Sequence, residues 1–180
     1  MATETKLRQL ADKGCPVYYF YSSERYLVRQ AVTAITRILT ADSDEDATVL
    51  DGAAPENEQL IMAAGTISFF GTRRVVVMPE IDPAAYSDKD LEELNSTLSS
   101  LENAVVVLGS VFELERSKLK TGKRAQKLIA QCKALGYTEE LAKPKPFELK
   151  MMMIDRAKEQ KTTLPDGAAA ALLERCGEDP

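Results

Sequence analysis

The first place where this sequence could do chemistry is the turn after its first apolar run, Val17–Tyr21. Alternating α/β folds commonly bind phosphate at such a turn. A P-loop needs the pattern G-x-x-x-x-G-K-[ST], in which glycine N–H groups surround the phosphate and lysine neutralises its charge. The sequence has no glycine between residues 17 and 39, and Glu24 places a carboxylate where a triphosphate would be repelled. The residues therefore predict a turn without a nucleotide site.

A second Gly-Lys pair, Gly122-Lys123, also departs from the P-loop pattern. The pattern would require glycine at position 117 and serine or threonine at 124, where the sequence has Ser117 and Arg124. The third apolar run ends with Glu80 alone, whereas a magnesium site would need paired acids there. We therefore expect no bound cofactor and no metal.

Missing residue types limit catalysis further. The sequence contains no histidine, so it cannot build a Ser-His-Asp or Cys-His pair or offer imidazole to a metal. Its three cysteines, Cys15, Cys132 and Cys176, lie far apart and form no Cys-x-x-Cys motif. An odd number of thiols is typical of a reducing cytoplasm. We expect no catalytic residue and place the function in surfaces.

The first candidate surface is apolar and lies between a helical pattern and the third apolar run. It contains Ile67, Phe69 and Phe70, and holds two of the five phenylalanines of the chain. Adjacent side chains on a turn diverge, so Phe69 and Phe70 cannot both point easily into one core. The pattern leaves core packing and an exposed hydrophobic anchor open as alternatives.

The second candidate surface is basic. Residues 113–133 hold seven basic and two acidic residues, within a chain of net charge −5. The candidate contacts with DNA or an acidic partner are Lys118, Lys120, Lys123, Arg124 and Lys127. A solvated helix face remains the alternative, because no aromatic residues are interleaved for base stacking.

These residues must be positioned by alternating strands and helices. The strands are expected at Val17–Tyr21, Thr48–Leu50, Arg74–Met78, Val105–Leu108 and Tyr137–Leu141. Uninterrupted apolar strands alternating with amphipathic helices predict an α/β fold with a five-stranded parallel sheet covered on both faces. After Pro144 and Pro146 the pattern changes to two short helices, which begin a small helical domain.

Composition agrees with a globular chain. The 180 residues are 44% hydrophobic and 28% charged, which excludes disorder as the main state. The net charge of −5 argues against a protein that simply coats nucleic acid. The apolar runs are too short to span a bilayer, and the N-terminal residues lack the apolar region of a secretory signal.

Several stretches together resemble the delta subunit of bacterial DNA polymerase III, the clamp loader subunit that opens the sliding clamp. They are VYYFYSSERYLVRQAV, TISFFGTRRVVVMPE, AVVVLGS, the basic helix, and the helices of PKPFEL and LPDGAAAALLERCGED. The resemblance covers nearly the whole chain. It departs from the family at Ser22-Ser23, where glycine more usually precedes the glutamate.

The resemblance implies a fold of the AAA+ superfamily. Residues 1–142 would be a RecA-like domain without a functional P-loop, and 143–180 the start of a helical lid domain. The family's C-terminal collar domain is absent from the sequence, so the chain resembles an N-terminal fragment. Ile67, Phe69 and Phe70 would form the wedge that enters a hydrophobic pocket of the clamp, with Ser68 as spacer.

The resemblance also implies a function in DNA replication without catalysis. The subunit would bind no ATP, and the nucleotidyltransferase activity of the polymerase would reside in another subunit. Its partners would be the beta sliding clamp, the gamma/tau and delta prime subunits of the loader, and primed DNA through the assembly. We expect a bacterial cytoplasmic protein without membrane contact. The alternatives are a degenerate P-loop nucleotide-binding protein and a DNA-binding module.

Overall fold

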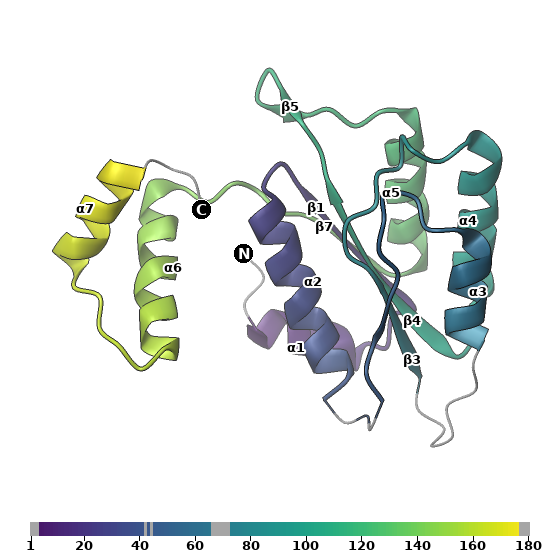
Figure 1. Ribbon diagram of the computed structural model, residues 1–180, viewed down its shortest axis with the longest axis horizontal. Helices are drawn as coiled ribbons and strands as arrows, with labels where there is room; N and C mark the ends of the chain where they lie inside the picture. The colour runs from purple at the N-terminus through teal and green to yellow at the C-terminus, as the bar shows by residue number, and fades with distance from the viewer. Residues whose placement is uncertain (1–3, 42, 44, 66–72, 177–180) are drawn as a thin grey trace. The chain divides into compact units, whose positions relative to one another are not determined.

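The computed structural model describes residues 4–41, 43, 45–65 and 73–176. These residues form two compact units, which divide between Leu141 and Ala142. The first unit is a sheet with helices on both faces, and the second is a pair of helices (Figure 1).

The first unit is built on a five-stranded sheet in which every pairing is parallel. Its order is β2-β3-β4-β1-β7. The strands are β1 (Val17–Ser22), β2 (Thr48–Val49), β3 (Arg74–Met78), β4 (Ala104–Val111) and β7 (Tyr137–Glu140). The helices are α1 (Glu4–Asp12), α2 (Arg25–Leu39), α3 (Asn57–Gly65), α4 (Asp88–Ser100) and α5 (Lys123–Leu135). The expected α/β fold with a parallel five-stranded sheet is confirmed.

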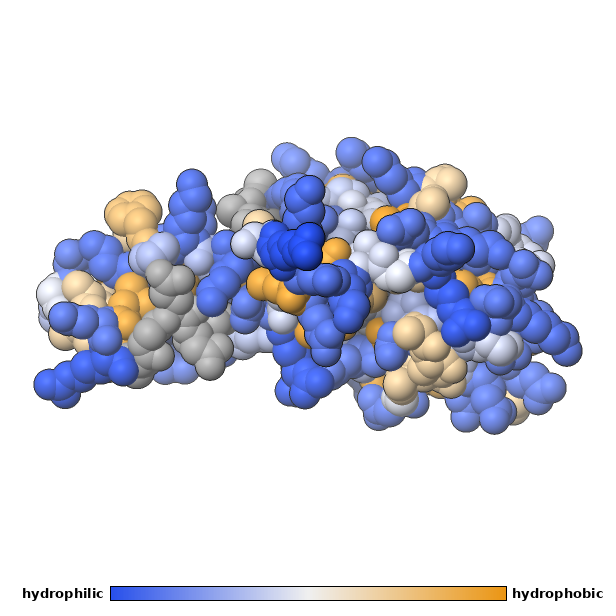
Figure 2. Space-filling model, turned by 90° about the horizontal axis from the view of Figure 1, so that it is seen from above, coloured by the Kyte–Doolittle hydropathy of each residue, from blue (hydrophilic) through white to orange (hydrophobic). Residues whose placement is uncertain are grey.

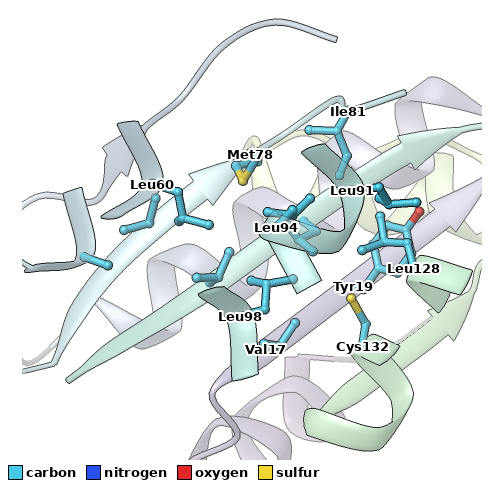
Figure 3. Packing of buried hydrophobic residues seen from close by; sticks show 14 of the residues in the cluster. Val17, Tyr19, Leu60, Met78, Ile81, Leu91, Leu94, Leu98, Leu128 and Cys132 are labelled. Carbon is cyan, nitrogen blue, oxygen red and sulfur yellow. The ribbon is translucent and has the colours of Figure 1, made fainter. Parts of the chain in front are cut away.

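The sheet separates two layers of helices. α1 and α2 cover one face, and α3, α4 and α5 cover the other (Figure 1). The uninterrupted apolar runs follow from this arrangement, because the central strands are buried on both faces. The cluster under α3–α5 includes Tyr19, Met78, Leu94 and Leu128 (Figure 3).

The buried hydroxyl groups of Tyr19 and Ser110 are hydrogen-bonded. The Tyr19 hydroxyl donates to Ser110 Oγ at 2.9 Å, and Ser110 Oγ donates to the Ile81 carbonyl at 2.8 Å. This short chain joins β1, β4 and the residue after the turn that ends β3. It avoids the cost of an unsatisfied polar group in an apolar layer.

Two elements of the first unit were not expected from the sequence. α1 packs on α2 and β1, with Leu7 and Leu10 buried and the Tyr18 hydroxyl donating to the Leu10 carbonyl at 2.9 Å. A small antiparallel hairpin, β5 (Leu114–Glu115) and β6 (Lys118–Leu119), follows β4. Both elements are too short to give a clear periodic pattern.

The second unit consists of α6 (Pro146–Glu159) and α7 (Asp166–Cys176). Pro146 suits the first turn of α6, and the Glu148 carboxylate accepts a hydrogen bond from the Lys145 N–H at 2.7 Å. The Lys150 ammonium pairs with Asp166 at 2.8 Å across the two helices. Among all described residues, no helix is both long and apolar enough to cross a membrane.

Candidate functional site

The predicted wedge residues Ile67, Phe69 and Phe70, with the spacer Ser68, lie outside the described residues. The next described residue, Arg73, is hydrogen-bonded to another segment of the first unit. Arg73 Nη1 donates to the Gly14 carbonyl at 2.9 Å, before β1.

Arg74, at the start of β3, is tied to two other segments. Its N–H donates to the Asn103 carbonyl at 3.1 Å, and its Nε lies 3.2 Å from a Glu45 carboxylate oxygen. The chain after the predicted wedge therefore starts from a fixed position in the sheet.

The helix before the predicted wedge exposes apolar side chains. In α3, Leu60 and Ala64 are buried, whereas Ile61 is 50% exposed and Met62 is 74% exposed. The face of the molecule in Figure 2 is largely hydrophilic, with small apolar areas. We did not single out Ile61 and Met62 from the sequence. The sequence does indicate this exposure. Residues 60–64 are all apolar, so a helix turn built from them must expose some apolar side chains.

The turn after β1 is held by hydrogen bonds of Ser22. Ser22 is fully buried, and its Oγ donates to the Leu141 carbonyl at 2.6 Å and accepts from the Glu24 N–H at 3.1 Å. The Ser22 carbonyl accepts from the Phe112 N–H at 2.8 Å. In a P-loop, N–H groups of this turn would face a phosphate. Here the Glu24 N–H already has an intramolecular partner.

An ion pair crosses the same edge of the sheet. Arg25, in the first turn of α2, places its guanidinium 2.6 Å from the carboxylate of Glu80, which follows β3. Both side chains remain partly exposed, so the pair contributes about 0–1 kcal/mol to stability. The pair joins the start of α2 to the segment after β3. In nucleotide-binding α/β folds, the ligand lies at this edge of the sheet.

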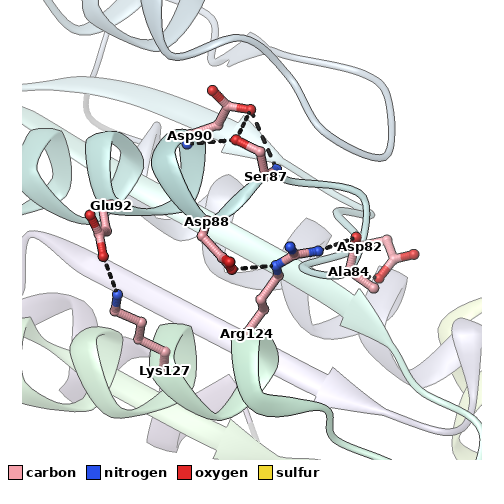
Figure 4. Close-up of polar contacts among 8 residues, drawn as sticks. All are labelled: Asp82, Ala84, Ser87, Asp88, Asp90, Glu92, Arg124 and Lys127. Carbon is pink, nitrogen blue, oxygen red and sulfur yellow. Dashed lines mark hydrogen bonds and ion pairs between the residues drawn. The ribbon is translucent and has the colours of Figure 1, made fainter.

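Two of the five basic residues predicted to contact DNA are engaged by α4. Arg124 Nε donates to an Asp88 carboxylate oxygen at 2.7 Å, and its Nη1 donates to the Ala84 carbonyl at 3.2 Å (Figure 4). Lys127 pairs with Glu92 at 2.8 Å. The hydrogen bond from Arg124, and then its charge, hold the pKa of the Asp88 carboxyl below its usual value.

The other three predicted residues lie on or beside the hairpin and are less constrained. Lys120 lies 3.8 Å from a Glu113 carboxylate oxygen, which is a loose pair. Lys118 in β6 and Lys123 at the start of α5 are exposed. Within the described part of the chain, neither has a carboxylate at ion-pair distance. Of the five residues, Arg124 and Lys127 thus have close carboxylate partners and Lys120 has a distant one.

The residues that the structure describes form no candidate metal site. They contain no group of three or more cysteine, aspartate or glutamate side chains placed to hold a metal ion. The thiol of Cys132 is buried in the core, and burial raises its pKa to about 12, so it is unreactive near neutral pH.

One family model matches the chain over residues 18–135, and its description is DNA polymerase III, delta subunit. The matched region runs from β1 to the end of α5 and includes the segment with Ile67, Phe69 and Phe70. A search of curated proteins gives no match.

Solved structures share the fold. A Bacillus subtilis DNA clamp loader delta protein has a TM-score of 0.60 at 23% identity, covering 95% of this chain and 52% of its own. A DNA polymerase III gamma subunit-related protein from Thermotoga maritima has a TM-score of 0.55 at 15% identity, with coverages of 94% and 57%. A Walker-type ATPase from Pyrococcus abyssi has a TM-score of 0.52 at 11% identity, with coverages of 97% and 63%. The chain spans about half the length of the Bacillus protein.

Proposed function

The chain belongs to the DNA polymerase III delta subunit family, and on this premise we propose that it binds and opens a sliding clamp. It would do so through a wedge of Ile67, Phe69 and Phe70, without binding ATP. The observation that carries the proposal is the family match, which spans the sheet and the segment containing the three apolar residues.

The residues on either side of the segment support an apolar contact there. Ile61 and Met62 already expose apolar surface on α3. On the other side, Arg73 and Arg74 fix the chain to the first unit. Apolar anchors that fill a partner's pocket commonly contribute about 2 kcal/mol or more each to binding.

Clamp opening then follows from differential binding. A ligand shifts a closed ring towards an open one only by the difference between its affinities for the two states. A shift from mostly closed to mostly open requires on the order of 5 kcal/mol. Two or three apolar anchors that are buried only against the open ring would supply a difference of this size.

The closed turn after β1 supports action without ATP. Ser22 satisfies the Glu24 N–H, and Arg25 at the start of α2 pairs with Glu80 after β3. Energy from ATP would therefore come from other subunits. The proposed partners are a beta sliding clamp, gamma/tau and delta prime subunits, and primed DNA, in a bacterial cytoplasm. The polymerase reaction would belong to another subunit of the holoenzyme.

Clamp binding by alanine variants tests this function. We expect Phe69→Ala and Phe70→Ala each to weaken binding to an immobilised sliding clamp by about 30-fold, the equivalent of about 2 kcal/mol. The matched control is Phe147→Ala, because Phe147 is 68% exposed but lies on α6 in the second unit. Wild-type affinity in both wedge variants, or an equal loss in the control, would refute the proposed wedge.

A further inference from the structure

The outer side of α2 carries arginine and tyrosine side chains. The helix contains Arg25, Arg29 and Arg37 and no acidic residue, in a chain whose net charge is −5. All three arginines are exposed, and Tyr26 is 44% exposed. With α1, the helix covers the face of the sheet opposite α3, α4 and α5 (Figure 1). The sheet therefore separates these side chains from α3, which precedes the proposed wedge.

Helical spacing divides α2 into a buried and an exposed side. Its buried residues are Leu27, Val28, Ala31, Val32 and Ile35. Tyr26, Arg29 and Arg37 lie on the other side, because intervals of three and eight residues return to nearly the same direction in an α-helix. Arg29 and Arg37 are about 12 Å apart along the helix axis. We call these three residues the arginine face.

The charges on α2 are not all compensated within the chain. The Arg25 guanidinium lies 2.6 Å from the Glu80 carboxylate, which neutralises it. Arg29 has no carboxylate at ion-pair distance in the part of the chain that the structure describes. Next to it on the same side, Tyr26 exposes an aromatic ring. Tyrosine and arginine are the residue types that most often dominate the energy of protein–protein contacts.

We propose that Tyr26, Arg29 and Arg37 form a docking surface for an acidic protein segment. Charge complementarity identifies the occupant, because α2 offers guanidinium groups and no carboxylate of its own. Guanidinium groups bind carboxylates through two parallel hydrogen bonds. The ring of Tyr26 adds an apolar contact, so the segment would carry an apolar side chain beside its acids.

A short peptide fits the arginine face better than a nucleic-acid strand does. A strand carries a phosphate at every nucleotide, and Glu24 places a carboxylate just before α2 in a chain that is negative overall. Binding of single strands also uses several aromatic side chains in succession, whereas Tyr26 is the one aromatic residue of α2. A peptide can instead present two carboxylates at the spacing of Arg29 and Arg37.

Fluorescence anisotropy with the full chain and a labelled peptide tests the arginine face. The probe has two glutamates separated by about 12 Å, which is about four residues of extended chain, and a leucine between them. Arg29→Ala and Tyr26→Ala should each weaken its binding about tenfold. A second peptide with serine in place of leucine should bind the wild type about tenfold more weakly and no longer respond to Tyr26→Ala. Binding should be lost in about 1 M salt, where the Debye length is about 3 Å.

The matched control is Arg175→Ala, because Arg175 is also an exposed helical arginine but lies on α7 in the second unit. It should bind the peptide like the wild type, and so should Tyr26→Phe, which keeps the ring. No saturable binding up to about 1 mM peptide, or an equal loss in Arg175→Ala, would overturn the docking surface. A labelled oligonucleotide that binds more tightly than the peptide and also depends on Arg29 would overturn it too.

Clamp binding by the same variants separates this inference from the proposed function. Arg29→Ala should keep wild-type affinity for the clamp, and Phe69→Ala should keep wild-type affinity for the peptide. If no chain binds a clamp while Arg29→Ala alone loses the peptide, the proposed function fails and the arginine face stands. Loss of peptide binding in Phe69→Ala would overturn the assignment to α2.

Discussion

At the scale of single residues, Gly109 in β4 shows how closely the layers approach. A Cβ atom at this position would lie 2.2 Å from the Pro79 carbonyl oxygen and 2.8 Å from Val28 Cγ1. Both distances are far below van der Waals contact. The first neighbour is backbone of the segment that follows β3, which cannot move aside like the end of a flexible side chain.

Gly109→Ala should therefore lower the free energy of unfolding by about 3 kcal/mol, through overpacking between β4 and its neighbours. The control is Gly65→Ala at the end of α3, where nothing lies within 4 Å of the added Cβ atom. Urea unfolding followed by circular dichroism measures both. Equal midpoints for the two variants would contradict the packing described for β4.

Buried acidic groups predict how stability depends on pH. Burial raises the pKa of the Cys132 thiol from 9.0 to about 12, and burial also raises the pKa of the neighbouring Tyr19 phenol. The unfolded chain releases these protons at ordinary values, whereas the folded chain retains them. Stability should thus be complete below pH 9 and decline as the pH rises towards about 12.

Denaturant unfolding at pH 8, 10 and 11 measures this decline. Cys132 alone should contribute about 1.4 kcal/mol for each pH unit above 9. Cys132→Val should reduce the slope of unfolding free energy against pH by about 1.4 kcal/mol per pH unit, the contribution of one proton. This holds whatever the substitution does to stability at pH 8. A variant with the wild-type slope would show that the thiol is not the titrating group.

Single-residue roles were only partly predictable from the sequence. The basic character of Arg124 and Lys127 is evident, but their partners Asp88 and Glu92 lie 36 and 35 residues away. The same holds for Glu80, whose partner Arg25 belongs to another element. The sequence shows which residues are charged. Which of them form ion pairs depends on which elements become neighbours in the fold.

At the scale of elements, long apolar patterns were predictable and short ones were not. β1, β3 and β4 are uninterrupted apolar runs, because helices cover both faces of the sheet. The hairpin β5–β6 has two residues in each strand and no apolar pattern. α1 depends on contacts with α2 and β1 that its own sequence does not reveal.

The start of α4 offers a test at this scale. Ser87 Oγ accepts from the Asp90 N–H at 3.1 Å, and the Asp90 carboxylate accepts from the Ser87 N–H at 3.4 Å, which completes a capping box. Ser87→Ala should lower the unfolding free energy by about 1 kcal/mol, and Ser87→Asp should restore most of it. Thermal unfolding compares the three proteins. An alanine variant as stable as the wild type would contradict the cap.

At the scale of the whole molecule, the parallel sheet is of the kind found in nucleotide-binding proteins. The turn after β1, where such proteins bind phosphate, is held by hydrogen bonds of Ser22. The likeness to a clamp loader protein and to a Walker-type ATPase, at 23% and 11% identity, shows the fold alone. Ser22, Arg25 and Glu80 occupy the edge where a nucleotide would bind. We place the proposed function at the apolar residues that precede β3 in the sequence.

The most direct test of the account is clamp release from circular DNA without ATP. A labelled sliding clamp is loaded on nicked circular DNA, and its loss is followed after addition of the wild-type chain or Phe70→Ala. The wild-type chain should accelerate release in proportion to its concentration, and the variant should leave release near its spontaneous rate. A wild-type chain that binds the clamp yet leaves the release rate unchanged would contradict clamp opening.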